Sequence, residues 1–97
     1  MIWLTRNMVG AFHRESLERF GGADGLRDEG FLLSALARPE NIFARESNVD
    51  VFRLAAAYCM GIVKNHPFID GNRRTGILSA VVFLGLNGVE VNFDEAM

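Results

Sequence analysis

The chain has 97 residues, which is enough for one domain and too few for two. Hydrophobic residues make up 49% of it and only two residues are proline, so the composition excludes a disordered protein. The formal net charge of −2 provides no basic surface for sequence-independent nucleic-acid binding, and we expect no direct contact with nucleic acid. Cys59 is the single cysteine, so neither an internal disulfide nor a cysteine-based metal cluster can form.

The sequence shows no sign of export or of membrane insertion. Residues 1–6 lack the basic start and the apolar stretch of a secretory signal. The apolar run 77–86 is interrupted by Ser79 and falls short of the roughly 20 residues that a membrane-spanning helix needs. We therefore expect a soluble, cytoplasmic protein that makes no membrane contact.

The chain begins with a short apolar segment, residues 2–4, which is typical of a strand. Thr5 is a suitable N-cap for a helix that runs to about Phe20. Gly21-Gly22 follows and ends this helix in the way common at helix C-termini. Residues 21–30 contain four glycines and predict a loop.

A second helix is predicted over residues 28–37, with Asp28 as its N-cap and Pro39 marking its end. Residues 38–48 predict a polar, irregular segment apart from the apolar pair Ile42-Phe43. Such a pair is either folded beneath the domain or available to a partner, and both interpretations stay open.

The clearest helical pattern covers residues 51–65. Asp50 is its N-cap, and Pro67 ends it because proline disfavours helical geometry at the residue before it. Apolar residues recur there at helical spacing: Val51, Leu54, Ala55, Tyr58 and Ile62. This spacing predicts one buried face.

Residues 72–86 predict a fourth helix, which ends at Asn87-Gly88. Apolar side chains lie almost all round it, and this predicts a place at the centre of a bundle. Apolar and polar residues then alternate over 89–93, as in a short strand. The predicted fold class is therefore mainly α: one helical domain over residues 1–97, with at most minor β-strands near both ends.

The loop between the last two predicted helices carries the chemically unusual residues. His66 follows the end of a buried helix, and an imidazole can accept a proton near neutral pH, as a general base acting on an alcohol must. Phe68 is an apolar residue in a polar loop and is expected to anchor that loop to the core. Asp70 offers a carboxylate, the ligand type that magnesium prefers.

The four residues that follow are typical of an anion site. Gly71 lets the backbone approach a ligand closely. Asn72 begins a helix whose free N–H groups and positive dipole end attract anions. Arg73 and Arg74 add two guanidinium groups beside that end. Each residue alone has a structural explanation as a loop, capping or solvated residue, but with the preceding base and carboxylate they indicate a phosphate-handling site.

This loop resembles the Fic motif, in which His-x-Phe-x-acid-Gly-Asn is followed by Gly or Lys and then Arg. The matching residues are His66-Pro67-Phe68-Ile69-Asp70-Gly71-Asn72-Arg73-Arg74. Segments 21–27, 33–39 and 74–88 are similar to the Doc (death-on-curing) branch of the Fic/Doc family, whose members are toxins of toxin–antitoxin pairs. The resemblance covers essentially the whole chain. Doc domains usually continue with further C-terminal helix, so the chain is either a short member or a fragment that lacks this segment.

The resemblance implies a role for each polar residue of the motif. His66 would activate a Ser, Thr or Tyr hydroxyl of a target protein. Asp70 would hold Mg²⁺ against the phosphates of the nucleotide. Gly71, Asn72 and the adjoining backbone amides would bind one phosphate, and Arg74 would bind another phosphate oxygen.

Two residues depart from the pattern of the Fic enzymes that transfer AMP. Those enzymes carry Gly where this chain has Arg73 and a second Arg where it has Ile77, so both changes argue against the usual pose for AMP transfer. Doc-type proteins carry Lys at position 73, whose charge Arg73 retains, and they resemble kinases that bind the nucleotide in an inverted pose. Gly71 is the Fic-like choice at a position where Doc has Ala, so the identity of the transferred group stays open.

We therefore expect a Doc-like toxin that transfers the terminal phosphate of ATP, with Mg²⁺, to a hydroxyl of a target protein. The alternatives are a Fic-type adenylyltransferase that uses the same His66, and a non-catalytic module that binds a nucleotide or a partner. The resemblance implies two protein partners: a cognate antitoxin and a target, which by family analogy is a translation factor. Residues 1–97 contain no inhibitory string of Ser or Thr, three spacers and Glu-Gly or Glu-Asn, so we expect inhibition to come from the antitoxin.

Overall fold

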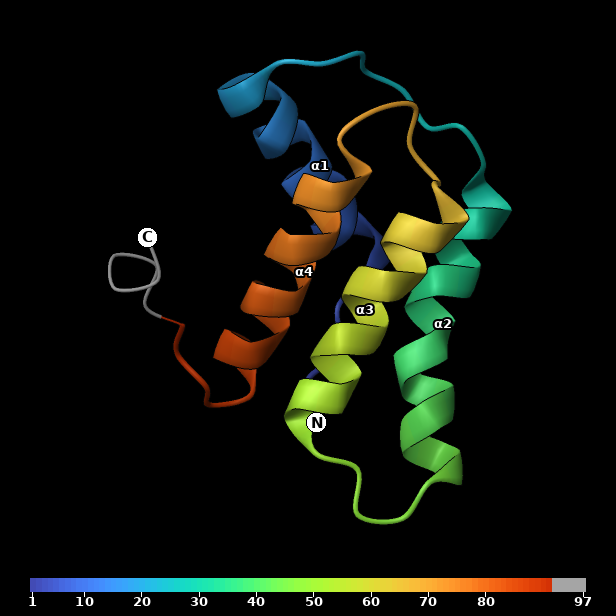
Figure 1. The fold of residues 1–97 in the computed structure, drawn as a ribbon, viewed down its shortest axis with the longest axis vertical. Helices are drawn as coiled ribbons and strands as arrows, with labels where there is room; N and C mark the ends of the chain where they lie inside the picture. Colours follow the sequence, from blue (N-terminus) through green and yellow to red (C-terminus); the bar gives the residue numbers. More distant parts are fainter. Residues whose placement is uncertain (92–97) are drawn as a thin grey trace.

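A computed structural model describes residues 1–91, which form four helices joined by loops (Figure 1). The helices are α1 (Arg6–Phe20), α2 (Glu29–Arg45), α3 (Val51–Asn65) and α4 (Asn72–Leu86). The predicted mainly α fold is thus confirmed. Within the described residues there is no strand, and the strand expected over 2–4 is wrong. The strand expected over 89–93 is absent from 89–91, and Phe93 lies outside the described residues.

The N-terminal segment is held by side chains and not by a neighbouring strand. The backbone amide of Ile2 donates to Asn87 Oδ1, and its carbonyl accepts from Asn87 Nδ2. The amide of Leu4 donates to the Tyr58 hydroxyl. These bonds satisfy an extended segment without a sheet, which is why the apolar pattern alone was misleading.

Three helices begin at the N-caps that the sequence predicts. The side chains of the caps Thr5, Asp28 and Asp50 accept hydrogen bonds from backbone amides three residues further on. Each satisfied amide is one of those that a helix leaves free at its N-terminus. The starts of α1, α2 and α3 are therefore set by local sequence.

α2 is longer than predicted because it continues through Pro39 to Arg45. Pro39 is fully buried, Ile42 packs against the hydrophobic core, and the ring of Phe43 meets Trp3 edge-on with centroids 5.5 Å apart. A proline removes one helical hydrogen bond and crowds the preceding turn, and these contacts offset that cost. The predicted helix end at Pro39 is wrong, as is the irregular structure expected immediately after it.

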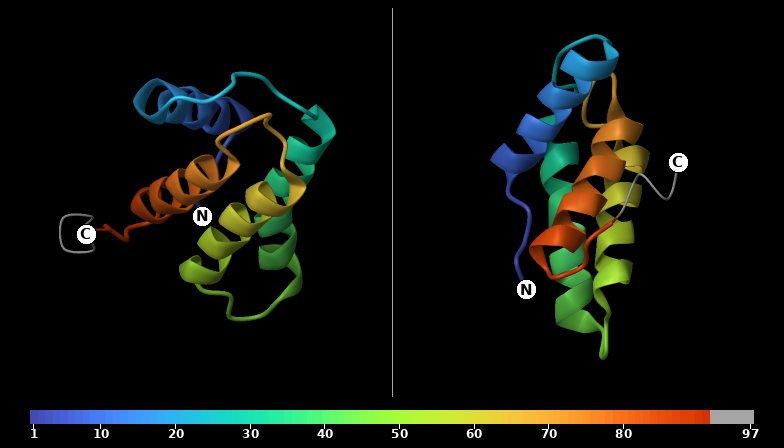
Figure 2. Two further views of the ribbon diagram at one scale, coloured as in Figure 1. Left: turned by 45° about the horizontal axis from the view of Figure 1, so that its top comes forward. Right: turned by 90° about the vertical axis from the view of Figure 1, so that its left-hand side faces the viewer.

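The helices pack in the order α2, α3, α4 and α1, so α3 and α4 are the two inner helices, and the prediction of a central α4 is confirmed. α3 packs against α2 on one side and α4 on the other, while α1 packs mainly against α4 (Figures 1 and 2). α4 meets α3 through small residues: a Cβ added to Gly76 would lie only 3.1 Å from the carbonyl oxygen of Cys59. Among the larger apolar side chains of α4, Phe83 and Leu84 are buried in the core, whereas Ile77 is 53% exposed.

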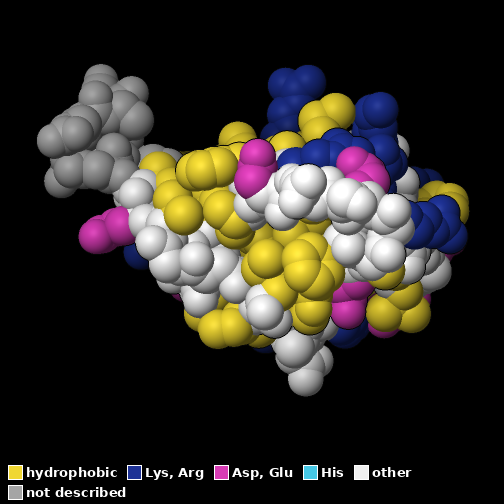
Figure 3. All heavy atoms as spheres, turned by 90° about the horizontal axis from the view of Figure 1, so that it is seen from below, with side chains coloured by type: hydrophobic (Ala, Val, Ile, Leu, Met, Phe, Trp, Pro, Cys, Tyr) yellow, Lys and Arg dark blue, Asp and Glu magenta, His cyan; other side chains and the backbone are white. Residues whose placement is uncertain are grey.

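Exposed apolar side chains also occur at the end of the molecule away from the motif loop. Figure 3 views that end: hydrophobic side chains lie across its middle, with charged ones mainly around them, and no described histidine is visible there. None of the helices in residues 1–91 combines the length and the apolar character that a membrane span requires.

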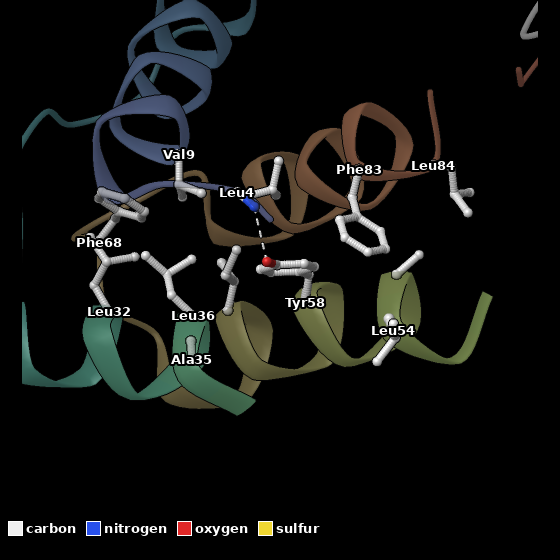
Figure 4. Close-up of a cluster of buried hydrophobic side chains, with 12 residues drawn as sticks. Leu4, Val9, Leu32, Ala35, Leu36, Leu54, Tyr58, Phe68, Phe83 and Leu84 are labelled. Carbon is white, nitrogen blue, oxygen red and sulfur yellow. Dashed lines mark hydrogen bonds between the residues drawn. The ribbon is translucent and has the colours of Figure 1, made fainter. Parts of the chain in front are cut away.

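Tyr58, on α3, is fully buried in the core, and its side chain points towards Leu4 and Phe83 (Figure 4). Its ring lies 5.0 Å from the ring of Phe83, and its hydroxyl accepts the Leu4 amide at 3.0 Å. Burial raises the pKa of Tyr58 to about 12, so the hydroxyl stays protonated at neutral pH. This hydrogen bond joins the segment before α1 to α3.

We expect Tyr58→Phe to lower the free energy of unfolding by about 1 to 3 kcal/mol, because the buried Leu4 amide loses its acceptor. Urea titration followed by circular dichroism measures the change. Phe52→Tyr is the matched control, because Phe52 lies on the same helix and is 59% exposed, so an added hydroxyl reaches water. Equal stability of Tyr58→Phe and the wild type would contradict this assignment.

Candidate functional site

A cleft of about 610 Å³ lies where α1 ends and α4 begins. Six of the seven site residues predicted from the sequence line it, and Phe68 is the one that does not. The cleft is lined by Phe20, Gly21, Gly22, Val63, His66, Asp70, Gly71, Asn72, Arg73 and Arg74. The structure thus brings the motif together with the glycine-rich end of α1, from which it is separated by about half of the chain.

His66 lies at the C-terminal end of α3 in a left-handed conformation, with φ 53° and ψ 54°. Its amide still donates to the Ile62 carbonyl at 3.1 Å, so His66 is the C-cap that directly follows the last helical residue, Asn65. A non-glycine residue with positive φ is uncommon and must be held by its surroundings. The bend turns the chain into the loop 66–71 and leaves the His66 side chain exposed at the cleft.

Phe68 anchors this loop from below. Its side chain is only 3% exposed and belongs to the core cluster. The ring of His13, on α1, stacks on it with centroids 3.9 Å apart and planes 8° from parallel. The His13 Nε2 atom lies 2.9 Å from the backbone oxygen of Asp70, and since a carbonyl can only accept, Nε2 carries the proton and donates. His13 therefore holds two points of the loop at once.

Asp70 presents an ionised carboxylate to the cleft. Its Oδ2 accepts from the Ala23 amide at 3.2 Å and its Oδ1 from the Gly71 amide at 2.8 Å. These two bonds lower the pKa of Asp70 below its usual value, and the charge of Arg74 acts in the same direction. A negative charge is thus fixed beside the start of α4.

The Asn72 side chain is used inside the loop. It is 5% exposed, its Oδ1 accepts from the Phe68 amide at 3.0 Å, and its Nδ2 donates to the Phe68 carbonyl at 2.9 Å. What Asn72 can offer a phosphate is therefore its backbone N–H. Gly71 is the N-cap of α4, with φ 76°, and provides no side-chain cap. The first amides of α4 are left free by the helix itself, as in an anion site.

Both arginines of this helix start line the cleft. Arg73 is exposed and lines the cleft. Arg74 is half-buried: its Nη2 donates to the Gly21 carbonyl at 2.9 Å, and its guanidinium lies 5.4 Å from the centroid of the Phe20 ring. A guanidinium has five N–H donors, so Arg74 keeps others for a ligand.

Asp70 is the residue that could hold a magnesium ion. The described part of the chain contains no group of three or more His, Cys, Asp or Glu side chains arranged for a metal. Magnesium is commonly bound by one or two carboxylates together with the phosphates of a substrate. A single ionised carboxylate beside the donors of α4 fits that pattern.

Sequence reasoning missed the contribution of the loop before α2. Gly22 leaves room for Asp70, because a Cβ there would lie 2.7 Å from Asp70 Oδ2. Arg27 donates to carbonyls at the end of α3, and His13 donates to the loop from α1. The four glycines of residues 21–30 were a signal for this, since each marks a place where a side chain can be excluded.

The sequence model of the Fic/DOC family matches residues 3–84. The chain belongs to the Fic/Doc family. It is 36% identical over 85 residues to Protein kinase doc of Escherichia phage P1, an alignment that covers 88% of this chain and 67% of the relative. It is 37% identical over 76 residues to Toxin Doc of Mycolicibacterium smegmatis, covering 77% of this chain and 58% of the relative.

These two relatives confirm the predicted resemblance to the Doc branch. The chain spans about two thirds of the length of the phage relative and 58% of the mycobacterial one. The matched region of the family runs through α1 to α4 and includes the whole cleft.

We expect Gly22→Ala to weaken magnesium-dependent nucleotide binding about tenfold more than Gly21→Ala does, a difference of about 1.4 kcal/mol. Both glycines have positive φ, so alanine is strained at either position. Only at Gly22 does the added Cβ displace the Asp70 carboxylate; at Gly21 it meets nothing within 4 Å. Calorimetric titration with an ATP analogue, with and without magnesium, measures the difference.

Gly21→Ala is the matched control for backbone strain in this experiment. Without magnesium the two variants should bind the analogue alike, because Asp70 then has no cation to present. Equal losses in both variants with magnesium present would contradict the part assigned to Asp70.

Proposed function

We propose that this protein is a Doc-type toxin that transfers the γ-phosphate of ATP to a hydroxyl of a target protein. The observation that carries the proposal is the convergence of an exposed imidazole, an ionised carboxylate, an uncapped helix N-terminus and two guanidinium groups on one cleft. These are the groups that phosphoryl transfer uses for proton removal, positioning and charge stabilisation. The names of the two relatives, a protein kinase and a toxin, support the same activity.

In this mechanism His66 accepts the proton of the target hydroxyl. The hydroxyl oxygen then bonds to the γ-phosphorus, the bond between that phosphorus and the β,γ-bridging oxygen breaks, and ADP leaves. The backbone amides at the start of α4 and the Arg74 guanidinium bind phosphate oxygens and stabilise the charge that develops on them. Asp70 would hold magnesium, which when bound would further neutralise the charge of the phosphates.

The geometry around α4 favours transfer of the terminal phosphate over transfer of AMP. Arg73 occupies the cleft where a glycine would leave space. Ile77 does not line this cleft but lies in a neighbouring, mainly apolar hollow with Phe20 and Leu78. Its side chain has no group that could donate a hydrogen bond to a phosphate. The usual pose for AMP transfer therefore lacks two supports, whereas an inverted nucleotide would bring its γ-phosphate towards His66.

A toxin of this kind needs a protein that restrains it, and we propose a cognate antitoxin as that partner. The name of the mycobacterial relative, Toxin Doc, supports a toxin that is paired with an antitoxin, and the name of the phage relative, Protein kinase doc, gives the activity to be restrained. The described residues expose apolar side chains that a partner segment could cover, among them Phe43, which is 46% exposed. The target is a second protein partner, with a translation factor as the candidate offered by family analogy.

We expect label to pass to a protein target from ATP labelled at the γ position and not from ATP labelled at the α position. The source of the target is an extract of cells whose growth the protein arrests. Electrophoresis and autoradiography show which label is transferred. Transfer from the α position would overturn the kinase in favour of adenylylation.

His66→Ala is the control for this experiment. It removes the base while the core, to which the His66 side chain does not contribute, keeps its packing. Labelling and growth arrest should both be lost at unchanged melting temperature. Magnesium-dependent nucleotide binding by the wild type without any transfer would favour the non-catalytic module.

We expect co-expression of the neighbouring antitoxin gene to abolish growth arrest by the wild-type protein. The reason is that residues 1–97 contain no inhibitory string. Colony counts with the neighbouring gene induced or silent measure the effect. Equal toxicity in both conditions would refute the partner.

A further inference from the structure

Arg27, in the loop before α2, is bonded to the backbone on both sides of His66. Its Nη2 donates to the Asn65 carbonyl at 2.9 Å and its Nε to the His66 carbonyl at 2.7 Å. The next carbonyl, of Pro67, accepts from the backbone amides of Arg27 and Asp28 at 2.6 and 3.0 Å. Three successive carbonyls thus face one arginine and its neighbour.

These bonds define the backbone of His66. The peptide plane before its Cα is held at both ends, by Arg27 at the Asn65 carbonyl and by the Ile62 carbonyl at the His66 amide. The plane after its Cα is held by Arg27 at the His66 carbonyl. Since φ and ψ are the rotations of these two planes about the Cα atom, they fix the direction of the Cα–Cβ bond.

His66 needs such support because its conformation is left-handed, with φ 53° and ψ 54°. For a residue with a side chain this conformation is less favourable than the helical one that precedes it. Without the two bonds from Arg27, the end of α3 would have unpaired carbonyls and the chain could adopt other turns. The imidazole would then leave its place at the cleft.

Arg27 itself is held in place. Its guanidinium carbon lies 5.0 Å from the centroid of the Phe31 ring, at the start of α2. Asn65 Nδ2 donates to the Phe31 carbonyl at 3.0 Å, which joins the same turn of α2 to the end of α3. The guanidinium is therefore set between α2 and α3 by contacts on both sides.

We propose that Arg27 is a positioning residue that holds His66 in the orientation required of a general base. This rests on the proposed phosphotransfer function, but the hold on the backbone is a property of the free protein. Arg27 lies outside the cleft lining and does not touch the nucleotide site. Its planar fork spans two carbonyls at once, whereas a lysine ammonium is a single point charge on a flexible stem.

Kinetics of label transfer from γ-labelled ATP test the proposal. Arg27→Ala should lower the rate at saturating ATP roughly 10- to 100-fold, as expected for a misplaced catalytic group, with the apparent KM for ATP within about twofold of the wild type. Arg27→Lys should recover only part of the rate. Added methylguanidinium should restore part of the activity of Arg27→Ala and none of that of His66→Ala.

Arg53→Ala is the matched control, because Arg53 also makes two hydrogen bonds, with Glu46, on an exposed part of α3 away from the cleft. It should keep the wild-type rate. Two results for Arg27→Ala would overturn the proposal: a raised KM for ATP with an unchanged maximal rate, or a rate equal to that of the wild type.

Nuclear magnetic resonance of the free protein separates this proposal from the proposed function. The ¹³C shifts and the HN–Hα coupling of His66 should show the left-handed conformation in the wild type and Arg53→Ala and lose it in Arg27→Ala. Unchanged His66 signals in Arg27→Ala would refute the positioning role whatever the activity. If Arg27→Ala loses the left-handed signals of His66 and the wild type shows no transfer activity, only the proposed function is refuted.

Discussion

The hold of residues 21–28 on the loop 66–71 is the interaction on which the site depends. A loop that follows a buried helix carries carbonyls that no helical amide can reach, and they need donors from elsewhere. Here the donors come from the loop before α2: Arg27 bonds to the end of α3, and the amides of Arg27, Asp28 and Ala23 reach the carbonyl of Pro67 and the carboxylate of Asp70. Figure 1 shows the two loops at the same end of the bundle.

In this arrangement the motif residues that determine the fold of the loop differ from those that are exposed to a ligand. Phe68 and Asn72 face inward, one in the core and the other bonded to the backbone of the first, and they determine how the loop folds. His66, Asp70 and Arg73 are exposed at the cleft. A ligand can thus meet a base, a carboxylate and a guanidinium without disturbing the packing that places them. Rigid support beneath exposed polar groups is what preorganisation requires.

The helices and their caps could be predicted from sequence because both depend on neighbours within a few residues. Thr5, Asp28 and Asp50 each cap an amide three positions away. The end of α2 could not be predicted in this way, because it depends on contacts of Ile42 and Phe43 with distant parts of the core. The motif residues were found through their spacing, whereas the contacts of His13, Gly22 and Arg27 with the loop join residues about 40 to 60 positions apart. Periodicity carries no information about such pairs.

The charge arrangement of the cleft follows from the same packing. Asp70 would repel a phosphate by itself, but its carboxylate is already bonded to two amides and lies near Arg74. The cleft therefore combines one anchored negative charge with the free amides of α4 and two guanidinium groups. This set of charges fits the proposed ligand, a nucleoside triphosphate with magnesium. Because Gly22 lets Asp70 approach the backbone of the segment after α1, that glycine-rich segment is as much a part of the site as the motif itself.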